Sequence, residues 1–179
     1  MRNGPTNPLL TDFTRVLLEL RWGDMDAYGH VNNVTQMQLL EEARVRALGS
    51  PTQSRDAVAV PGAHGAAEVV SGLPMPEVFG AASATTELLV ASHLVEYRSP
   101  IAYRPGPIAV DLVVSEVKPA SVTIGYVVCE PDGSRVYTVA ETVIAFVDTT
   151  TGRPRRLTEE EIAGLTEVVR DPVRLRSRR

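Results

Sequence analysis

The chain has 179 residues, of which 44% are hydrophobic and 22% charged, and its formal net charge is -4. This length fits one domain with a real core but not two full ones, and the composition is typical of a globular protein. The slightly acidic balance gives no reason to expect a nucleic-acid partner.

Cys129 is the only cysteine, so no disulfide can form within the chain, which fits a reducing compartment. The three histidines and the single thiol show no pair at metal-ligand spacing, so no metal site is predicted. The N-terminal segment has no apolar run long enough for a signal peptide or a membrane span. We therefore expect a cytoplasmic protein with no membrane partner.

The first half of the chain changes its periodicity twice. Residues 1–12 are expected to form a flexible leader, and residues 13–22 carry the β-branched and apolar residues of a strand. Gly, Asp and Asn then predict a structured loop. From about Asn33 apolar residues recur at three- and four-residue steps, which predicts a helix that Asn32 or Asn33 caps. Residues 50–84, rich in Pro, Gly, Ala and Ser, are predicted to be a long excursion.

The second half is rich in Val, Ile, Leu, Thr and Tyr between short breaker segments. Four strands are predicted, over Thr86–Tyr97, Ile108–Val117, Ser121–Cys129 and Val136–Val147. The last two separators are short enough to join antiparallel neighbours. Thr158 and Glu161 form a capping box for a helix over about 158–169, and residues 171–179 are expected to be a solvated basic tail.

This order of elements predicts an α+β arrangement. One early helix against five strands, four of them consecutive and long, indicates a hotdog fold: a curved five-stranded antiparallel sheet wrapped around a central helix, plus a C-terminal helix. We expect residues 13–170 to form this single domain.

The loop before the central helix concentrates polar chemistry, since its sequence from 21 to 33 is RWGDMDAYGHVNN. A helix start offers unpaired N–H groups and a positive dipole end, which can stabilise an oxyanion. A carboxylate opposite can act as general base or nucleophile. Turn formation and capping by Asp24 and Asn32 are the competing interpretation, and residue types alone favour it.

A family resemblance changes that balance. The run DMDAYGHVNN (24–33), followed by LLEEAR (39–44), resembles the signature of the 4-hydroxybenzoyl-CoA thioesterase-like family, and is also similar to plant acyl-ACP thioesterases. The resemblance covers about residues 13–48, and the VEYRSP stretch (95–100) is similar to the family's second strand. It implies a hotdog acyl-CoA thioesterase that works without metal or organic cofactor, with CoA as part of the substrate.

The resemblance also implies roles for residues. Asp26 matches the catalytic carboxylate, with Asp24 structural, and the N–H near Asn33 matches the group that polarises the thioester carbonyl. His30 matches a histidine near that carbonyl. Tyr28 stands where acyl-ACP enzymes carry asparagine, which argues against an acyl-ACP substrate. The residues expected to contact substrate are Tyr28, Val31 and Asn32, and, through the CoA phosphates, Arg98 and Arg104.

Several other residues compete for functional roles. Glu41 or Glu42 could be a helix-borne base, although Glu42 is better placed to pair with Arg46. His64, His93 and the packed thiol of Cys129 are expected to be incidental. Further candidates for contact with CoA phosphates are Lys118, Arg153, Arg155 and Arg156, although a solvated surface charge is the simpler interpretation for each. Residues that could cover an acyl pocket are Met75 and Phe79, although they could equally pack at the surface.

The predicted function is hydrolysis of an acyl-CoA to free acid and CoA. The alternatives are a non-catalytic acyl-CoA-binding hotdog protein, an acyl-ACP thioesterase and a hotdog hydratase or dehydratase. The open sheet edge and the resemblance both predict a homodimer or homotetramer.

Overall fold

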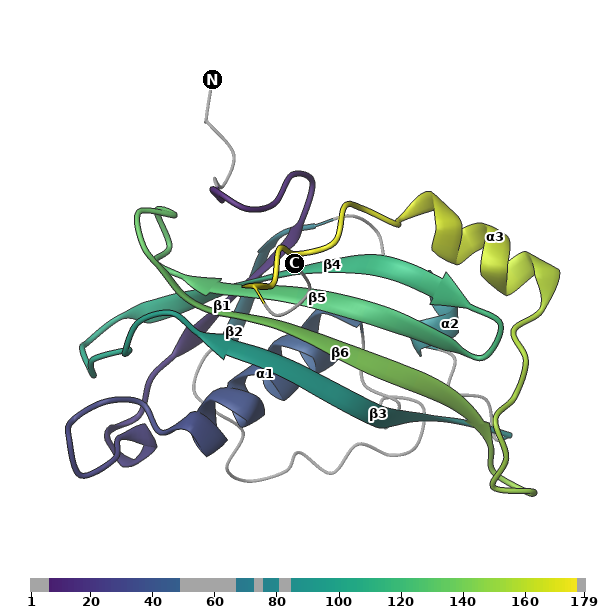
Figure 1. Ribbon diagram of the computed structural model, residues 1–179, viewed down its shortest axis with the longest axis horizontal. Helices are drawn as coiled ribbons and strands as arrows, with labels where there is room; N and C mark the ends of the chain where they lie inside the picture. Colours follow the sequence, from purple (N-terminus) through teal and green to yellow (C-terminus); the bar gives the residue numbers. More distant parts are fainter. Residues whose placement is uncertain (1–6, 49–66, 73–75, 81–84, 177–179) are drawn as a thin grey trace.

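The computed structural model of the chain describes residues 7–48, 67–72, 76–80 and 85–176. One curved antiparallel sheet dominates these residues, with one long helix across it (Figure 1). No helix within these ranges has the length and apolar character needed to cross a lipid bilayer. The elements in chain order are β1 (Thr14–Glu19), the 3-10 turn η1 (Trp22–Asp24), α1 (Asn33–Leu48), β2 (Ala67–Ser71), α2 (Glu77–Gly80), β3 (Thr86–Tyr97), β4 (Pro107–Lys118), β5 (Ser121–Cys129), β6 (Val136–Asp148) and α3 (Glu159–Glu167).

The sheet runs in the order β2-β1-β4-β5-β6-β3, and every neighbouring pair is antiparallel. The two predicted hairpins, β4–β5 and β5–β6, are confirmed. In the second, Gly133 adopts a φ of 75°, which favours glycine, and donates its N–H to the Glu130 carbonyl at 2.8 Å. The α+β hotdog architecture expected from the sequence is therefore confirmed.

The sheet has six strands, so the prediction of five was one short. The additional strand is β2, which lies inside the segment 50–84 that was predicted as an excursion, and it pairs with the edge of β1. A five-residue segment surrounded by Ala, Gly and Pro is too short to show a clear strand periodicity. Its stability comes from pairing with β1, which lies far away in the sequence, so the local pattern does not predict the strand.

The inner face of the sheet packs on α1. Alternate residues of β4 and β5 point toward the helix, where Leu39, Leu40 and Ala43 meet them in the main hydrophobic core. This alternation is the period of two expected for a strand with one face on a core. Phe79 of α2 is fully buried in the same core, so it packs inside the domain.

The outer face is also covered. Both terminal segments cross it, as Figure 1 shows for the residues after α3, and they bury Leu10, Val173 and Leu175 against β4, β5 and β6. A Cβ atom on Gly125 would approach a Val173 methyl group within 3.0 Å, so the C-terminal segment lies directly on β5. Leu10, Val173 and Leu175 therefore pack on the sheet, while Arg174 and Arg176 beside them are exposed. The flexible leader and the basic tail stay predictions.

Candidate functional site

The loop between β1 and α1 is closed by its own backbone. The Asp26 N–H donates to the His30 carbonyl at 2.7 Å, and the Gly29 N–H donates to the Asp26 carbonyl at 3.1 Å. Gly29 has a φ of 76°, a conformation that residues with a Cβ rarely adopt. This tight turn fixes Asp26 and His30 beside each other at the entry to the helix.

Asp26 presents one engaged and one unengaged carboxylate oxygen. Its Oδ1 accepts hydrogen bonds from the N–H groups of Tyr28 at 2.8 Å and His30 at 3.1 Å. Within the described ranges of the chain, Oδ2 has no hydrogen-bond partner, and the residue is half-buried. The backbone therefore orients the carboxylate while one oxygen stays available for water or substrate.

Asp24 has the opposite environment, although it lies only two residues away. It is 2% exposed, and its Oδ2 accepts from the Arg21 N–H at 2.7 Å while Oδ1 faces the Arg21 guanidinium at 3.3 Å. Its carbonyl accepts from the Asn32 N–H at 2.9 Å. Asp24 thus closes the loop, which is the structural role that the sequence predicted.

The loop that holds Asp26 leads directly into the N-terminus of α1. The Asn32 side chain accepts from the Val34 N–H at 2.8 Å, and the Asn32 carbonyl accepts from the Gln36 N–H at 2.9 Å, so Asn32 is the capping residue. The Asn33 N–H has no acceptor in the part of the chain that the structure describes. It is a free donor at the positive end of a 16-residue helix.

Three tyrosines surround this helix start. The Tyr97 hydroxyl donates to the Asn33 carbonyl at 3.5 Å, and the Tyr103 N–H donates to the Gly29 carbonyl at 3.4 Å. Tyr28 is 86% exposed and Tyr97 is 49% exposed. The sequence did not identify Tyr97 or Tyr103 as residues of the site. A usable signal was their position, because Tyr97 ends the predicted strand 86–97 and Tyr103 lies in the connection that follows it.

Val31, which was expected to contact substrate, is placed in the core instead of at the surface. It is 3% exposed, belongs to the main hydrophobic cluster and donates its N–H to the Ile101 carbonyl at 2.8 Å. The neighbouring bridge between His30 and Ala102 ties the same loop to the β3–β4 connection. Val31 therefore anchors the loop, and its contact with substrate stays a prediction.

A buried polar group under α1 was not anticipated from the sequence. Arg44 is 8% exposed, and its guanidinium faces the Tyr126 hydroxyl and the Glu41 carboxylate, each at 3.4 Å. On β3, Nδ1 of His93 lies 2.9 Å from the Thr142 hydroxyl oxygen. Burial, assisted by the charge of Arg44, lowers the pKa of His93. His93 thus has a defined partner, and its surroundings disfavour the protonated imidazole.

The two arginines proposed for the CoA phosphates have contacts away from Asp26. Arg104 donates to Glu130 at 2.6 Å and to the Tyr137 hydroxyl at 3.1 Å. Arg98 donates to the carbonyl of Arg174 at 2.8 Å, on the outer face of the sheet. The structure thus brings Asp26, His30 and Asn33 into one loop and helix start, whereas Arg98 and Arg104 have partners elsewhere.

The competing carboxylate Glu42 pairs with Arg46 at 2.7 Å, as the helical spacing predicted. Cys129 is buried, and burial, with Asp111 nearby, raises the pKa of its thiol to about 12, so its predicted role as a packed thiol is confirmed. The remaining basic candidates with acidic partners are Lys118 with Glu116 and Arg155 with Glu161. His64 and Met75 lie outside the described residues.

Comparisons with known proteins identify the family and the fold. The profile of the Thioesterase-like superfamily matches residues 20–170. A comparison with curated protein sequences gave no match. Among solved structures, a candidate acyl-CoA thioesterase from Xanthomonas campestris is 31% identical, with a TM-score of 0.54, over 79% of this chain and 97% of that one.

Two more distant structures share the fold. A candidate thioesterase from Escherichia coli, YbaW, is 20% identical with a TM-score of 0.65, over 88% of this chain and 99% of that one. A thioesterase from Thermus thermophilus, solved in complex with coenzyme A and Zn, is 19% identical with a TM-score of 0.61, over 89% of this chain and 96% of that one. At such identities the similarity establishes the fold alone.

Proposed function

The chain belongs to the Thioesterase-like superfamily, and we propose that it hydrolyses an acyl-CoA to a free acid and CoA at the loop that holds Asp26. The observation that carries the proposal is the presence of two unused groups within one loop and helix start. Within the described residues, Oδ2 of Asp26 accepts no hydrogen bond and the Asn33 N–H donates none. One can activate a nucleophile, and the other can stabilise the charge that forms on a carbonyl oxygen.

The reaction needs water as its only co-reactant. Water, or Asp26 itself in a covalent route, attacks the thioester carbonyl, and the negative charge that develops on its oxygen is stabilised by the Asn33 N–H and the positive end of α1. In the direct route Asp26 takes a proton from the attacking water, the C–S bond breaks, and this proton passes to the leaving thiolate, which departs as CoA. In the covalent route the C–S bond breaks as Asp26 forms a mixed anhydride with the acyl group, and water then hydrolyses the anhydride to the free acid, supplying the proton for CoA. His30 and Tyr28 hold Oδ1 through their amides, so they position the carboxylate for either route.

Around this centre we assign supporting roles to the aromatic residues. Tyr97 donates to the Asn33 carbonyl and thereby fixes the first turn of α1, which carries the oxyanion donor. Tyr28 follows Asp26 by two residues in the sequence, and its exposed ring is available to contact the thioester arm of a substrate. We therefore propose Asp26 and Asn33 as the catalytic groups, with His30 positioning Asp26 through its amide. Tyr28 and Asn32 are proposed as substrate neighbours.

The decisive variant is Asp26→Asn, which keeps the size and the acceptor oxygen but removes the charge. We expect thiol release from acyl-CoA to fall by about 10²–10⁴-fold, the usual contribution of a general base, with thermal unfolding nearly unchanged. Glu42→Gln is the matched control, because Glu42 lies on α1 and pairs with Arg46. A thiol reagent suits the assay, because Cys129 is buried with its pKa raised to about 12 and contributes little signal.

The outcome of the same assay separates the alternatives. Hydrolysis by Asp26→Asn at the wild-type rate would contradict the proposed mechanism. A wild-type protein that binds acyl-CoA but releases no thiol is a binding protein or a hydratase, and one that releases thiol only from acyl-ACP is an acyl-ACP thioesterase. A panel of short, medium, long and aromatic acyl-CoAs would identify the acyl group.

We also propose that a second copy of the chain pairs along β3. This strand ends the sheet order, and it exposes Leu89 (48%) and Val90 (42%) along its length and Tyr97 (49%) at its C-terminal end. Unpaired edge strands with exposed apolar residues favour pairing with another chain. Such a dimer covers the β3 side of the helix start, where Tyr97 contacts Asn33.

The variant Val90→Lys tests this dimer, because it places a charge at the proposed interface. We expect it to sediment as a monomer with reduced thiol release. Val70→Lys is the matched control, since Val70 is 46% exposed on β2 at the opposite edge of the sheet. A wild-type protein that sediments as a fully active monomer would contradict the proposal.

A further inference from the structure

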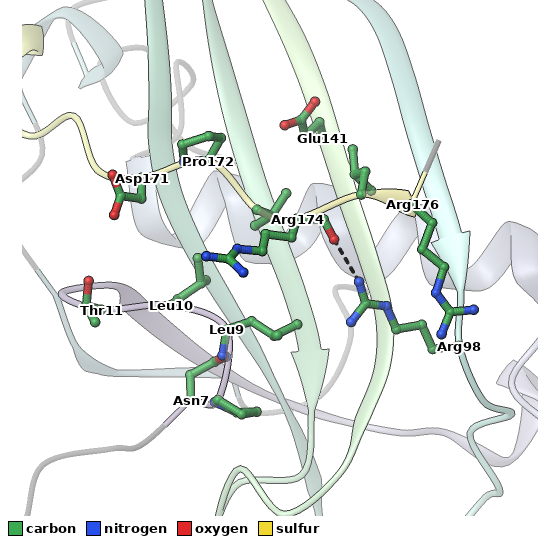
Figure 2. Close-up of a pocket in the computed structure, with 13 residues that line it drawn as sticks. Asn7, Leu9, Leu10, Thr11, Arg98, Glu141, Asp171, Pro172, Arg174 and Arg176 are labelled. Carbon is green, nitrogen blue, oxygen red and sulfur yellow. Dashed lines mark hydrogen bonds between the residues drawn. The ribbon is translucent and has the colours of Figure 1, made fainter. Parts of the chain in front are cut away.

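The two terminal segments enclose a large hollow on the outer face of the sheet. Its volume is about 1090 Å³, and its walls come from residues 7–11, residues 171–176, Arg98 after β3 and Glu141 of β6 (Figure 2). It lies on the face of the sheet opposite α1. Pockets of this size hold small-molecule ligands.

Three arginines line this hollow without acidic partners. Within the described residues, Arg98, Arg174 and Arg176 form no ion pair, and their guanidinium groups donate one hydrogen bond, from Arg98 to the Arg174 carbonyl. The Nε of Arg98 is buried and has no hydrogen-bond partner. A buried donor without an acceptor is unfavourable unless a ligand supplies one.

The hollow also has two carboxylates and an apolar side. Figure 2 shows the carboxylates of Glu141 and Asp171 directed away from the guanidinium groups of Arg98 and Arg176. Arg98 and Arg176 therefore form a positive end, whereas the Arg174 guanidinium extends to the other side of the hollow, toward Leu10. The apolar wall can take an uncharged portion of a ligand, and it consists of Pro8, Leu9, Leu10, Pro172, Val173 and Leu175.

The walls of the hollow lie mostly outside the family domain. The superfamily profile matches residues 20–170, whereas the segments 7–11 and 171–176 fall on either side of this range. Arg174 and Arg176 flank Leu175, which is 5% exposed, so the packing of Leu175 on the sheet sets the position of both arginines. Arg176 at the positive end thus lies outside the residues that the family profile matches, whereas Arg98 lies within them.

We propose that this outer-face hollow binds a phosphate-bearing ligand, with Arg98 and Arg176 contacting the phosphate oxygens. Guanidinium groups present planar, paired donors that match phosphate geometry, and neither of these two is neutralised by a described carboxylate. The ligand can be the nucleotide end of the CoA substrate or an independent phosphorylated compound. Only the first source rests on the hydrolysis proposed above.

The test is the binding of pyrophosphate, adenosine 3′,5′-bisphosphate and CoA, measured by calorimetry on the full chain at low ionic strength. In the double variant Arg98→Gln/Arg176→Gln we expect affinity to fall about tenfold or more, because charge-assisted hydrogen bonds are lost. The control is Arg153→Gln/Arg156→Gln, which removes two exposed arginines near α3. The Asp26→Asn variant should bind as the wild type does, so this measurement is independent of turnover.

Kinetics then identify the source of the phosphate. If the nucleotide end of CoA occupies the hollow, the double variant raises KM for acyl-CoA more than for acyl-pantetheine, which lacks the nucleotide. If binding weakens while both KM values stay unchanged, the ligand is an independent phosphate compound and the site stands. The proposal is overturned if the wild type binds none of the three probes, or if the control variant weakens binding equally.

Discussion

Two charged sites, one at the start of α1 and one on the outer face of the sheet, hold their groups in opposite ways. At the start of α1, Asp26 keeps one carboxylate oxygen unused and the Asn33 N–H has no described acceptor. On the outer side, Arg15 and Asp111 form a buried pair in which both side chains are 3% exposed or less. The first arrangement can receive a ligand, whereas the second is closed.

The outer pair is saturated by several neighbours. Arg15 donates twice to Asp111, at 2.6 Å from both Nε and Nη2, and also to the Pro131 carbonyl at 2.5 Å. Asn7 from the leader donates to Asp111 at 2.5 Å, and Cys129 contacts the same carboxylate at 3.7 Å. A fully bonded buried pair holds chain segments in register, and a partly bonded carboxylate at a loop retains capacity for chemistry.

The largest effect on stability is expected from Asp111→Asn, which sharpens this comparison. It leaves the charge of Arg15 buried without its counter-ion, so we expect the free energy of unfolding to fall by about 3–5 kcal/mol. Urea denaturation would measure this loss. Asp26→Asn serves as the counterpart, because it should change turnover while altering stability by less than about 1 kcal/mol.

Asn7→Ala is the matched control for the outer pair. It removes one hydrogen bond to Asp111 but keeps the Arg15 pair, so it should cost about 1 kcal/mol. If Asp111→Asn unfolds at the wild-type urea midpoint with an unchanged slope, the outer cluster does not stabilise the fold and the contrast between the two sites fails.

The difference between the two sites also explains how far the sequence could predict this molecule. The hotdog order of elements, the cap at Asn32 and the loop that presents Asp26 are local patterns, so a short stretch of sequence contains them. The pair of Arg15 with Asp111 joins residues 96 positions apart. Nothing local to either residue indicates such a partner, and the same applies to the burial of Val173 on β5.

The core positions show a related limit. Arg44 lies on the helix face that packs against the sheet, and its contact with Tyr126 depends on tertiary packing rather than on helical spacing. A charged residue in a predicted helix is most often on the exposed face, so the pattern alone indicated solvent. Likewise, β2 depends on its pairing with β1 and was missed for that reason.

A smaller effect is expected where the same arginine–carboxylate chemistry is less buried. Arg155 pairs with Glu161 through two 2.9 Å hydrogen bonds at the start of α3, with side chains 23% and 25% exposed. Glu161 also accepts from the Thr158 N–H at 2.8 Å, which completes the predicted capping box. Partial solvation weakens such a pair relative to Arg15 and Asp111.

The pH dependence of the free energy of unfolding of Glu161→Gln measures how much the Glu161 charge stabilises the fold. The hydrogen bonds from Arg155, followed by the Thr158 backbone, lower the pKa of Glu161 below its ordinary value. A depressed carboxyl pKa adds stability that is present above the ordinary pKa near 4.3 and is lost as the pH falls through the folded-state value. We expect Glu161→Gln to cost about 1 kcal/mol at pH 7 and progressively less below about pH 4, in urea unfolding measured from pH 7 to 3. The control is Glu160→Gln, which changes an exposed residue in the same turn and should show no such pH dependence. If Glu161→Gln lowers the free energy of unfolding equally at pH 3 and pH 7, the charge of Glu161 does not stabilise the cap.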